Sequence, residues 1–150
     1  MLLLTLRWLA LASMSFWLGG FTFYSAVVNP MLREELGGLE AGTVTGRVSE
    51  VLNRIGVGTM ASWGVLAFAE RSLGGKAPRR LRIGLIVVDV LILHALITLH
   101  PVLDAKLEAG DMSRFHSLHQ TYLIASTAQW VVNLALLAIT VWLWRGSERH

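Results

Sequence analysis

Apolar runs that are long enough to cross a membrane alternate with short polar segments along the whole chain. A membrane-spanning helix needs about 20 mostly apolar residues, at a rise of about 1.5 Å per residue. The second run, Ile55–Ala69, is short, but its helix can extend outward through the polar segment Thr43–Arg54. The pattern predicts one all-α domain over residues 1–150, an integral membrane four-helix bundle with spans at about 8–28, 50–69, 83–100 and 119–144.

The connection after the first run carries residues that usually end helices. Asn29-Pro30 is expected to end the first helix, and Gly37-Gly38 to break the chain before the second. The first run is interpreted as an uncleaved span. It is longer than the apolar region of a signal peptide.

Charged residues are divided unequally between the connections, and this division indicates the orientation. Basic residues dominate both ends and the second connection: Arg7, Arg71, Lys76, Arg79, Arg80, Arg82, Arg145 and Arg149. Acidic residues dominate the first and third connections: Glu34, Glu35, Glu40, Asp104, Glu108 and Asp111. Because short loops rich in Lys and Arg stay on the cytoplasmic side, both the N- and C-termini are expected to be cytoplasmic.

The composition agrees with a membrane protein and excludes other classes. Only 15% of the residues are charged and 54% are hydrophobic, whereas about 25% of an average domain is charged. The absence of cysteine excludes disulfides, thiolate metal sites and thiol catalysis. The net charge of +3 does not indicate nucleic acid, because the basic residues flank apolar runs. The expected partner is a lipid bilayer, with a homo-oligomer or a membrane-complex partner left open.

Small residues recur on one face of the first helix, at spacings of three and four. They are Ala12, Ser15, Gly19, Thr22, Ala26 and Asn29, and the second helix offers a similar set in Gly58, Ala61 and Ser62. Because membrane helices approach each other closely through small residues, both faces are predicted to pack inside the bundle.

The fourth helix carries a polar seam. Its members follow His119 at intervals of three or four residues, which places them on one face; they are Tyr122, Ser126, Gln129 and Asn133. An unpaired polar group in hydrocarbon costs up to several kcal/mol, so the seam must face protein or a wet crevice. Two interpretations stay open: a hydrogen-bonded bundle core, and the lining of a pathway or ligand cavity.

Asp89 lies inside the third apolar run. A carboxylate within a bilayer is costly, and it marks a functional hypothesis by default. The sequence allows this side chain to be protonated, paired with Arg7, or hydrogen-bonded to Ser13 or Ser15. The interpretations are structural pairing and a role in handling a proton or an ion.

Histidines gather at the predicted outer end of the bundle. His100 ends the third helix, and His116 and His119 begin the fourth. Imidazole suits copper, zinc and haem iron, so these three residues are the candidate ligands of a copper or zinc ion. His100 with His119 is the candidate pair for haem. Charged residues of the second helix are candidate partners of this cluster: Arg47, Glu50 and Arg54.

Four motifs stand in order along the chain. They are W-x-G-G-x-x-F from Trp17 to Phe23 with Pro30 after it, A-G-x-x-x-G from Ala41 to Gly46, His100-Pro101, and F-x-x-L-H from Phe115 to His119. Together they resemble the DUF4149 family of small four-span bacterial membrane proteins, which is similar to eukaryotic transmembrane protein 205 and more distantly to copper-resistance D (CopD)-type proteins. The resemblance implies a protein of the bacterial inner (cell) membrane and no particular reaction. His119 is the one histidine of the fourth helix on a motif position, and the Gln129–Asn133 seam departs from the family pattern.

The sequence favours a non-enzymatic membrane protein that handles a metal ion or another small solute at the outward polar cluster. The alternative is a structural or accessory membrane subunit whose seam seals an intramembrane interface, and a b-type haem electron-transfer protein is a third hypothesis. Catalysis has less support. Asp89 and His100 lie about 16 Å apart along one helix, and the chain has no serine-triad or metalloprotease motif.

Overall fold

The computed structural model describes residues 1–71 and 76–147, and Arg149 lies outside this part of the chain. The elements are α1 (Leu2–Phe23), a π-helical segment η1 (Tyr24–Val28), α2 (Asn29–Ala69), α3 (Lys76–Glu108) and α4 (Met112–Ser147). The predicted all-α class is confirmed.

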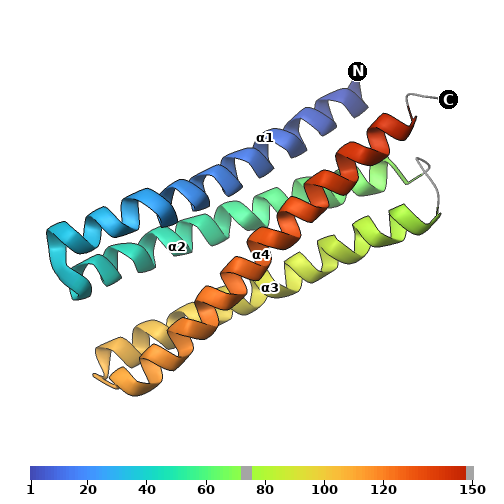
Figure 1. The fold of residues 1–150 in the computed structure, drawn as a ribbon. Helices are drawn as coiled ribbons and strands as arrows, with labels where there is room; N and C mark the ends of the chain where they lie inside the picture. Colours follow the sequence, from blue (N-terminus) through green and yellow to red (C-terminus); the bar gives the residue numbers. More distant parts are fainter. Residues whose placement is uncertain (72–75, 148–150) are drawn as a thin grey trace.

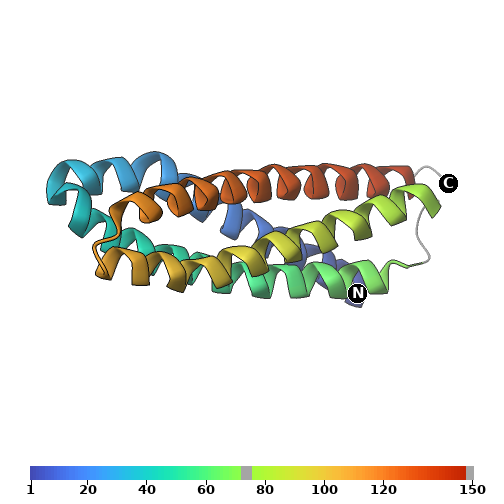
Figure 2. The same ribbon diagram turned by 90° about the horizontal axis from the view of Figure 1, so that it is seen from below.

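The chain reverses its direction inside α2, at Gly37. This residue has φ 76° and ψ 171°, a conformation that glycine adopts without the steric cost that a side chain would bring. The first leg of α2 therefore continues the line of α1, and the second leg returns beside it. Gly110, with φ 71°, lies in the turn between α3 and α4. The start of α1 and the end of α4 lie at one end of the bundle, and these two turns lie at the other (Figures 1 and 2).

Three helical stretches are long and apolar enough to cross a membrane: Leu2–Gly38, Lys76–Glu108 and Met112–Gly146. The chain is therefore a multi-pass membrane protein. The fourth predicted span, 50–69, lies in the second leg of α2 and is not among them. Its apolar part is short, and the polar residues Asn53 and Arg54 precede it.

The prediction that Asn29-Pro30 ends the first helix is wrong. In η1 the Asn29 N–H donates to the Tyr24 carbonyl, five residues earlier, so the helix widens just before the proline. A proline inside an α-helix removes one hydrogen bond and crowds the carbonyl four residues before it. A single π-helical turn changes that geometry, and the helix continues to Gly37. Pro101 is likewise accommodated inside α3.

The buried face of α1 differs from the predicted one. Ala10, Met14 and Trp17 are buried, spaced four and three apart, and they pack in one cluster with Met60 and Trp63 of α2. The stripe of small residues points outward instead, and its exposed members are Ala12, Ser15, Gly19, Thr22 and Ala26. The prediction that this stripe packs inside the bundle is wrong, because Met14 and Trp17 fill the interior instead. In the corresponding set of α2, Gly58 and Ala61 are also exposed, whereas Ser62 is half-buried.

Candidate intramembrane polar site

The polar seam of α4 faces the interior of the bundle. Its members are each at most 9% exposed: Tyr122, Ser126, Gln129 and Asn133. Buried Leu136 and Thr140 continue the same face toward the end of α4. At the start of the seam, Asn53 Nδ2 donates to the Tyr122 hydroxyl at 3.1 Å, and the Ser126 hydroxyl donates to the Tyr122 carbonyl at 2.9 Å. This part of the seam therefore has hydrogen-bond partners within the protein.

Asp89 of α3 is fully buried against the middle of the seam. The side-chain amides of Gln129 and Asn133 lie beside its carboxyl group. Within the described residues, neither Asp89 oxygen completes a hydrogen bond of normal geometry, and Gln129 Nε2 and Asn133 Oδ1 are also buried without partners. We call these three residues the Asp89 cluster. Because unpaired polar groups are costly in hydrocarbon, the Asp89 cluster is the candidate intramembrane polar site.

The partners that the sequence suggested for Asp89 are wrong. Arg7 Nε binds Glu70 at 2.7 Å, and the Ser13 hydroxyl pairs with the Ser62 hydroxyl at 3.0 Å. Ser15 is exposed. The rotation of α1 explains the two serines, because its buried face turns Ser13 toward α2 and Ser15 outward.

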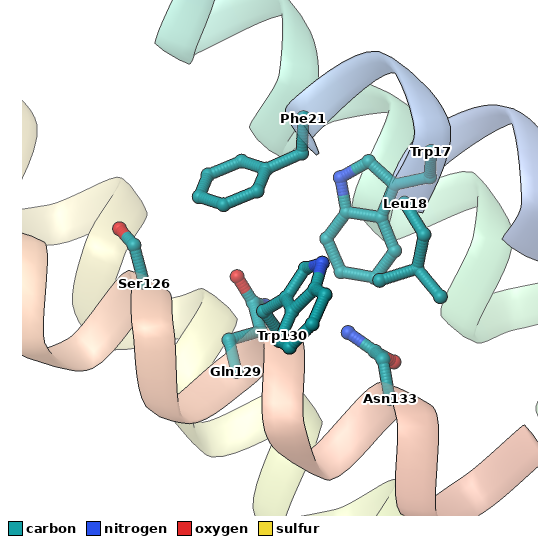
Figure 3. A pocket seen from close by; sticks show the side chains of 7 residues that line it. All are labelled: Trp17, Leu18, Phe21, Ser126, Gln129, Trp130 and Asn133. Carbon is teal, nitrogen blue, oxygen red and sulfur yellow. The ribbon is translucent and has the colours of Figure 1, made fainter. Parts of the chain in front are cut away.

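A small cavity of about 10 Å³ lies between α1 and α4, beside the Asp89 cluster. Its walls are Trp17, Leu18, Phe21, Ser126, Gln129, Trp130 and Asn133. In Figure 3, the side chains of Gln129, Trp130 and Asn133 from α4 face those of Trp17, Leu18 and Phe21 from α1. A water molecule needs about 10–15 Å³ of such space, so the cavity accommodates one water-sized group.

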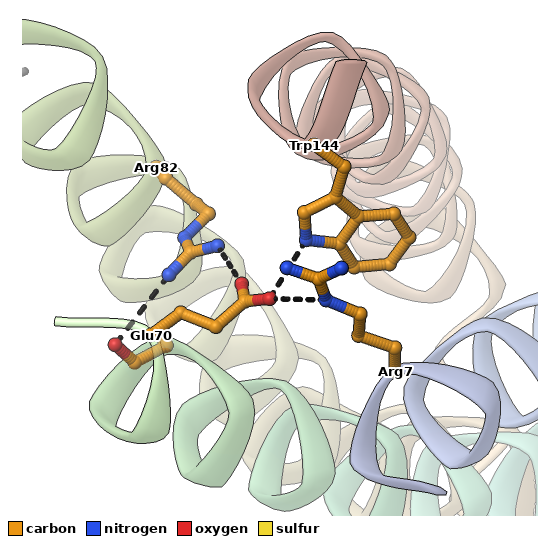
Figure 4. Close-up of polar contacts among 5 residues, drawn as sticks. Arg7, Glu70, Arg82 and Trp144 are labelled. Carbon is orange, nitrogen blue, oxygen red and sulfur yellow. Dashed lines mark hydrogen bonds and ion pairs between the residues drawn. The ribbon is translucent and has the colours of Figure 1, made fainter. Parts of the chain in front are cut away.

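Glu70 forms a second polar centre, at the end of the bundle that holds the termini (Figure 4). It follows the last residue of α2, and its side chain is fully buried. Its Oε1 accepts from Arg7 Nε at 2.7 Å and from Trp144 Nε1 at 2.8 Å, and its Oε2 accepts from Arg82 Nη1 at 2.6 Å. One carboxylate thus joins α1, α2, α3 and α4. We call these four residues the Glu70 clasp.

Sequence reasoning missed this clasp. A signal was present, since Glu70 is the one acidic residue in a connection with five basic residues, Arg71, Lys76, Arg79, Arg80 and Arg82.

His100 is engaged through both ring nitrogens. Nε2 lies 2.8 Å from the Gly46 carbonyl oxygen, and Nδ1 lies 3.2 Å from Asp104 Oδ2. A Cβ at Gly46 would lie 3.7 Å from the His100 ring, an ordinary van der Waals distance. Binding of a metal or haem iron by His100 would require one of these two contacts to break.

The other two candidate metal ligands make local contacts on α4. His119 stacks on Phe115, with ring centroids 5.6 Å apart, and His116 Nδ1 lies 2.7 Å from the Met112 carbonyl oxygen. In the described part of the chain, no group of three or more His, Cys, Asp or Glu side chains is placed to hold a metal ion. The copper or zinc site at His100, His116 and His119 stays a prediction.

The predicted charge partners lie on an exposed face of α2. Arg47, Glu50 and Arg54 are all exposed, and Arg54 Nη2 contacts Glu50 Oε1 at 2.5 Å across one helical turn. An exposed pair of this kind contributes only a few tenths of a kcal/mol. Their role as partners of the histidines stays a prediction.

The fold and the buried polar cluster define an all-helical, multi-pass membrane protein. The family described as "Domain of unknown function (DUF4149)" matches residues 12–111. The chain belongs to this family, which confirms the resemblance seen in its motifs. The match covers most of α1, all of α2 and all of α3, and it ends before α4, so Gln129 and Asn133 lie beyond the matched residues. Comparisons with curated proteins and with solved structures found no match.

Proposed function

We propose that this membrane protein binds and releases a proton or a small monovalent cation at the Asp89 cluster. The observation that carries the proposal is the fully buried carboxyl group of Asp89, which faces the amides of Gln129 and Asn133 and has no cationic partner in the described residues. An isolated charge in a low-dielectric interior is very costly. A proton or a cation at the carboxyl group balances that charge.

The chemistry of the cluster suits a proton or a hard cation. Carboxylate and amide oxygens bind cations of this kind, whereas copper prefers nitrogen and sulfur ligands. The Gln129 amide can donate to a carboxylate, and Asn133 Oδ1 can accept a hydrogen bond from a carboxylic acid or from a water on a cation. The adjoining cavity of about 10 Å³ is close to the space that one water needs. We therefore propose the Asp89 cluster, rather than the outer histidines, as the solute site.

The test compares Asp89→Asn with Asp104→Asn in liposomes. Both substitutions change an aspartate of α3 to asparagine, but the Asp104 side chain is 57% exposed and contacts His100, outside the Asp89 cluster. Proton uptake is followed with an internal pH-sensitive dye under a potassium diffusion potential, and Na⁺ uptake with a radioactive tracer. We expect uptake of one of the two ions by wild type and by Asp104→Asn, and its loss in Asp89→Asn. Uptake that persists in Asp89→Asn contradicts the proposal, as does wild-type protein that moves neither ion.

We also propose four crossings, with both termini on the cytoplasmic side of the inner (cell) membrane of a bacterium. The basic residues at the end that holds the termini support this orientation, and the packing of the second leg of α2 on α1 and α3 supports the fourth crossing. The chain has no cysteine, so Arg79→Cys and Glu108→Cys each provide one label site. A membrane-impermeant maleimide is expected to label Glu108→Cys in intact cells and Arg79→Cys only after lysis. The reverse pattern contradicts this orientation.

The alternative, an accessory subunit or a homo-oligomer, is favoured by one observation: the exposed stripe of small residues on α1. Faces of this kind let membrane helices pack closely. Gly19→Leu tests it, with Gly84→Leu of α3 as the control, because a Cβ at either position meets nothing within 4 Å. If the stripe is an interface, Gly19→Leu reduces the recovery of oligomer or partner, while Gly84→Leu does not. Equal recovery from the two variants rules the interface out.

A further inference from the structure

A groove separates part of α1 from α4 on the outside of the bundle. Among neighbouring helices, α1 and α4 contact each other least. The groove has a volume of about 190 Å³ and is lined by Phe21, Thr22, Ser25, Thr127 and Trp130. Thr22, Ser25 and Thr127 are exposed, so in a membrane protein the groove opens toward the lipid.

The groove and the small inner cavity share two walls, Phe21 and Trp130. The indole N–H of Trp130 donates to the Thr22 hydroxyl at 3.0 Å, and this bond links α4 to α1 at the boundary between the two spaces. The groove and the cavity therefore adjoin at Trp130.

The inner end of this path is polar, although the outer end is mostly apolar. In Figure 3, Gln129 turns its amide oxygen and Asn133 its amide nitrogen to the side of the cavity. Both side chains are buried. The cavity therefore offers one acceptor and one donor in a space of about 10 Å³. A hydroxyl group, which both donates and accepts, matches this pair in size and in chemistry.

We propose that the groove is a side entrance by which a small alcohol dissolved in the bilayer reaches the interior. Its hydroxyl group lies between Gln129 and Asn133, and its apolar chain lies in the groove between Phe21 and Trp130. Entry requires the bond between Trp130 and Thr22 to open. The hydroxyl group contacts the atoms of the two amides that face the cavity. The proposal therefore does not depend on whether Asp89 exchanges ions.

The test is photolabelling of the protein in lipid nanodiscs with an octanol that carries a diazirine. Adducts are located by mass spectrometry of peptides. We expect adducts concentrated on the segments that contain Phe21 and Trp130. An excess of 1-hexanol should remove them, whereas hexane at the same membrane concentration should not. Even labelling along all lipid-facing helices, or equal competition by hexane, overturns the proposal.

Two variants identify the residues responsible. Gln129→Met removes the polar group at similar length and is expected to abolish the competition by 1-hexanol. The control Gln120→Met changes an exposed residue of the same helix and should behave as wild type. Trp130→Phe removes the donor to Thr22 and should increase labelling above the wild-type level, which keeps the proposal testable if Gln129→Met does not fold. Labelling by Trp130→Phe at or below the wild-type level counts against the side entrance.

Discussion

Glu70→Gln provides a direct test of how the bundle is held together at the end that contains the termini. The substitution keeps the size of the side chain but removes its charge. In the native protein both carboxylate oxygens are bonded, to Arg7 and Trp144 on one side and to Arg82 on the other. After the substitution, one of the two positions carries an NH₂ group that faces a donor instead of accepting from it.

The expected cost follows from burial. The Arg82 side chain is 4% exposed, so its charge stays in the interior without a counter-charge. Breaking a buried ion pair by removing one partner costs about 3–5 kcal/mol. The control is Glu50→Gln, which makes the same chemical change in the exposed pair with Arg54, where the side chains are 52% and 76% exposed. An exposed i,i+4 pair contributes about 0.3–0.5 kcal/mol.

The assay is equilibrium unfolding of both variants in mixed detergent micelles, followed by tryptophan fluorescence. We expect Glu70→Gln to lose about 3–5 kcal/mol of unfolding free energy, and Glu50→Gln to lose no more than about 0.5 kcal/mol. Adding Arg82→Met to Glu70→Gln should recover part of the loss, because the uncompensated charge is then absent. If the two single variants differ by less than about 1 kcal/mol, the charge of Glu70 does not hold this end of the bundle together.

Two further predictions use the same unfolding assay. Gly56→Ala places a Cβ 2.5 Å from the Trp17 ring, so it should destabilise the protein by about 1–3 kcal/mol. The control is Gly58→Ala, whose Cβ meets nothing within 4 Å; it should be neutral or stabilising by up to about 1 kcal/mol. Equal effects of the two substitutions would contradict the packing of α1 on α2. Tyr122→Phe removes the acceptor for Asn53 Nδ2. It should cost about 0.6 kcal/mol, the average for hydrogen bonds between membrane helices, and no more than about 1.7 kcal/mol. An unchanged stability would show that the bond contributes nothing.

The parts of the fold that could be predicted depend on periodicity. A helix places every third or fourth residue on one face whatever its neighbours are, so the all-α class and the shared face of Gln129 and Asn133 follow from the sequence. The position of the two termini at one end follows from an even number of long helices.

The parts that could not be predicted depend on contacts between distant segments. The fit of Met14 and Trp17 against α2 decides which face of α1 is buried. The pattern of small residues on α1 does not indicate that this other face packs better. The continuation of the helix past Pro30 depends on one π-helical turn. The Glu70 clasp joins residues as far apart as Arg7 and Trp144, which local patterns do not relate.

The two buried carboxylates of this protein have opposite surroundings, and the contrast bears on function. Glu70 faces two guanidinium groups and an indole N–H, all of which are donors, so its surroundings stabilise one charge state only. Asp89 faces the two amides Gln129 and Asn133. An amide has both a donor and an acceptor, so it can bond a carboxylate through its NH₂ group and a carboxylic acid or hydrated cation through its oxygen. A buried carboxylate that only held helices together would be expected to have surroundings like those of Glu70. An exchange site instead requires surroundings that can bond both the charged and the protonated or cation-bound carboxyl group.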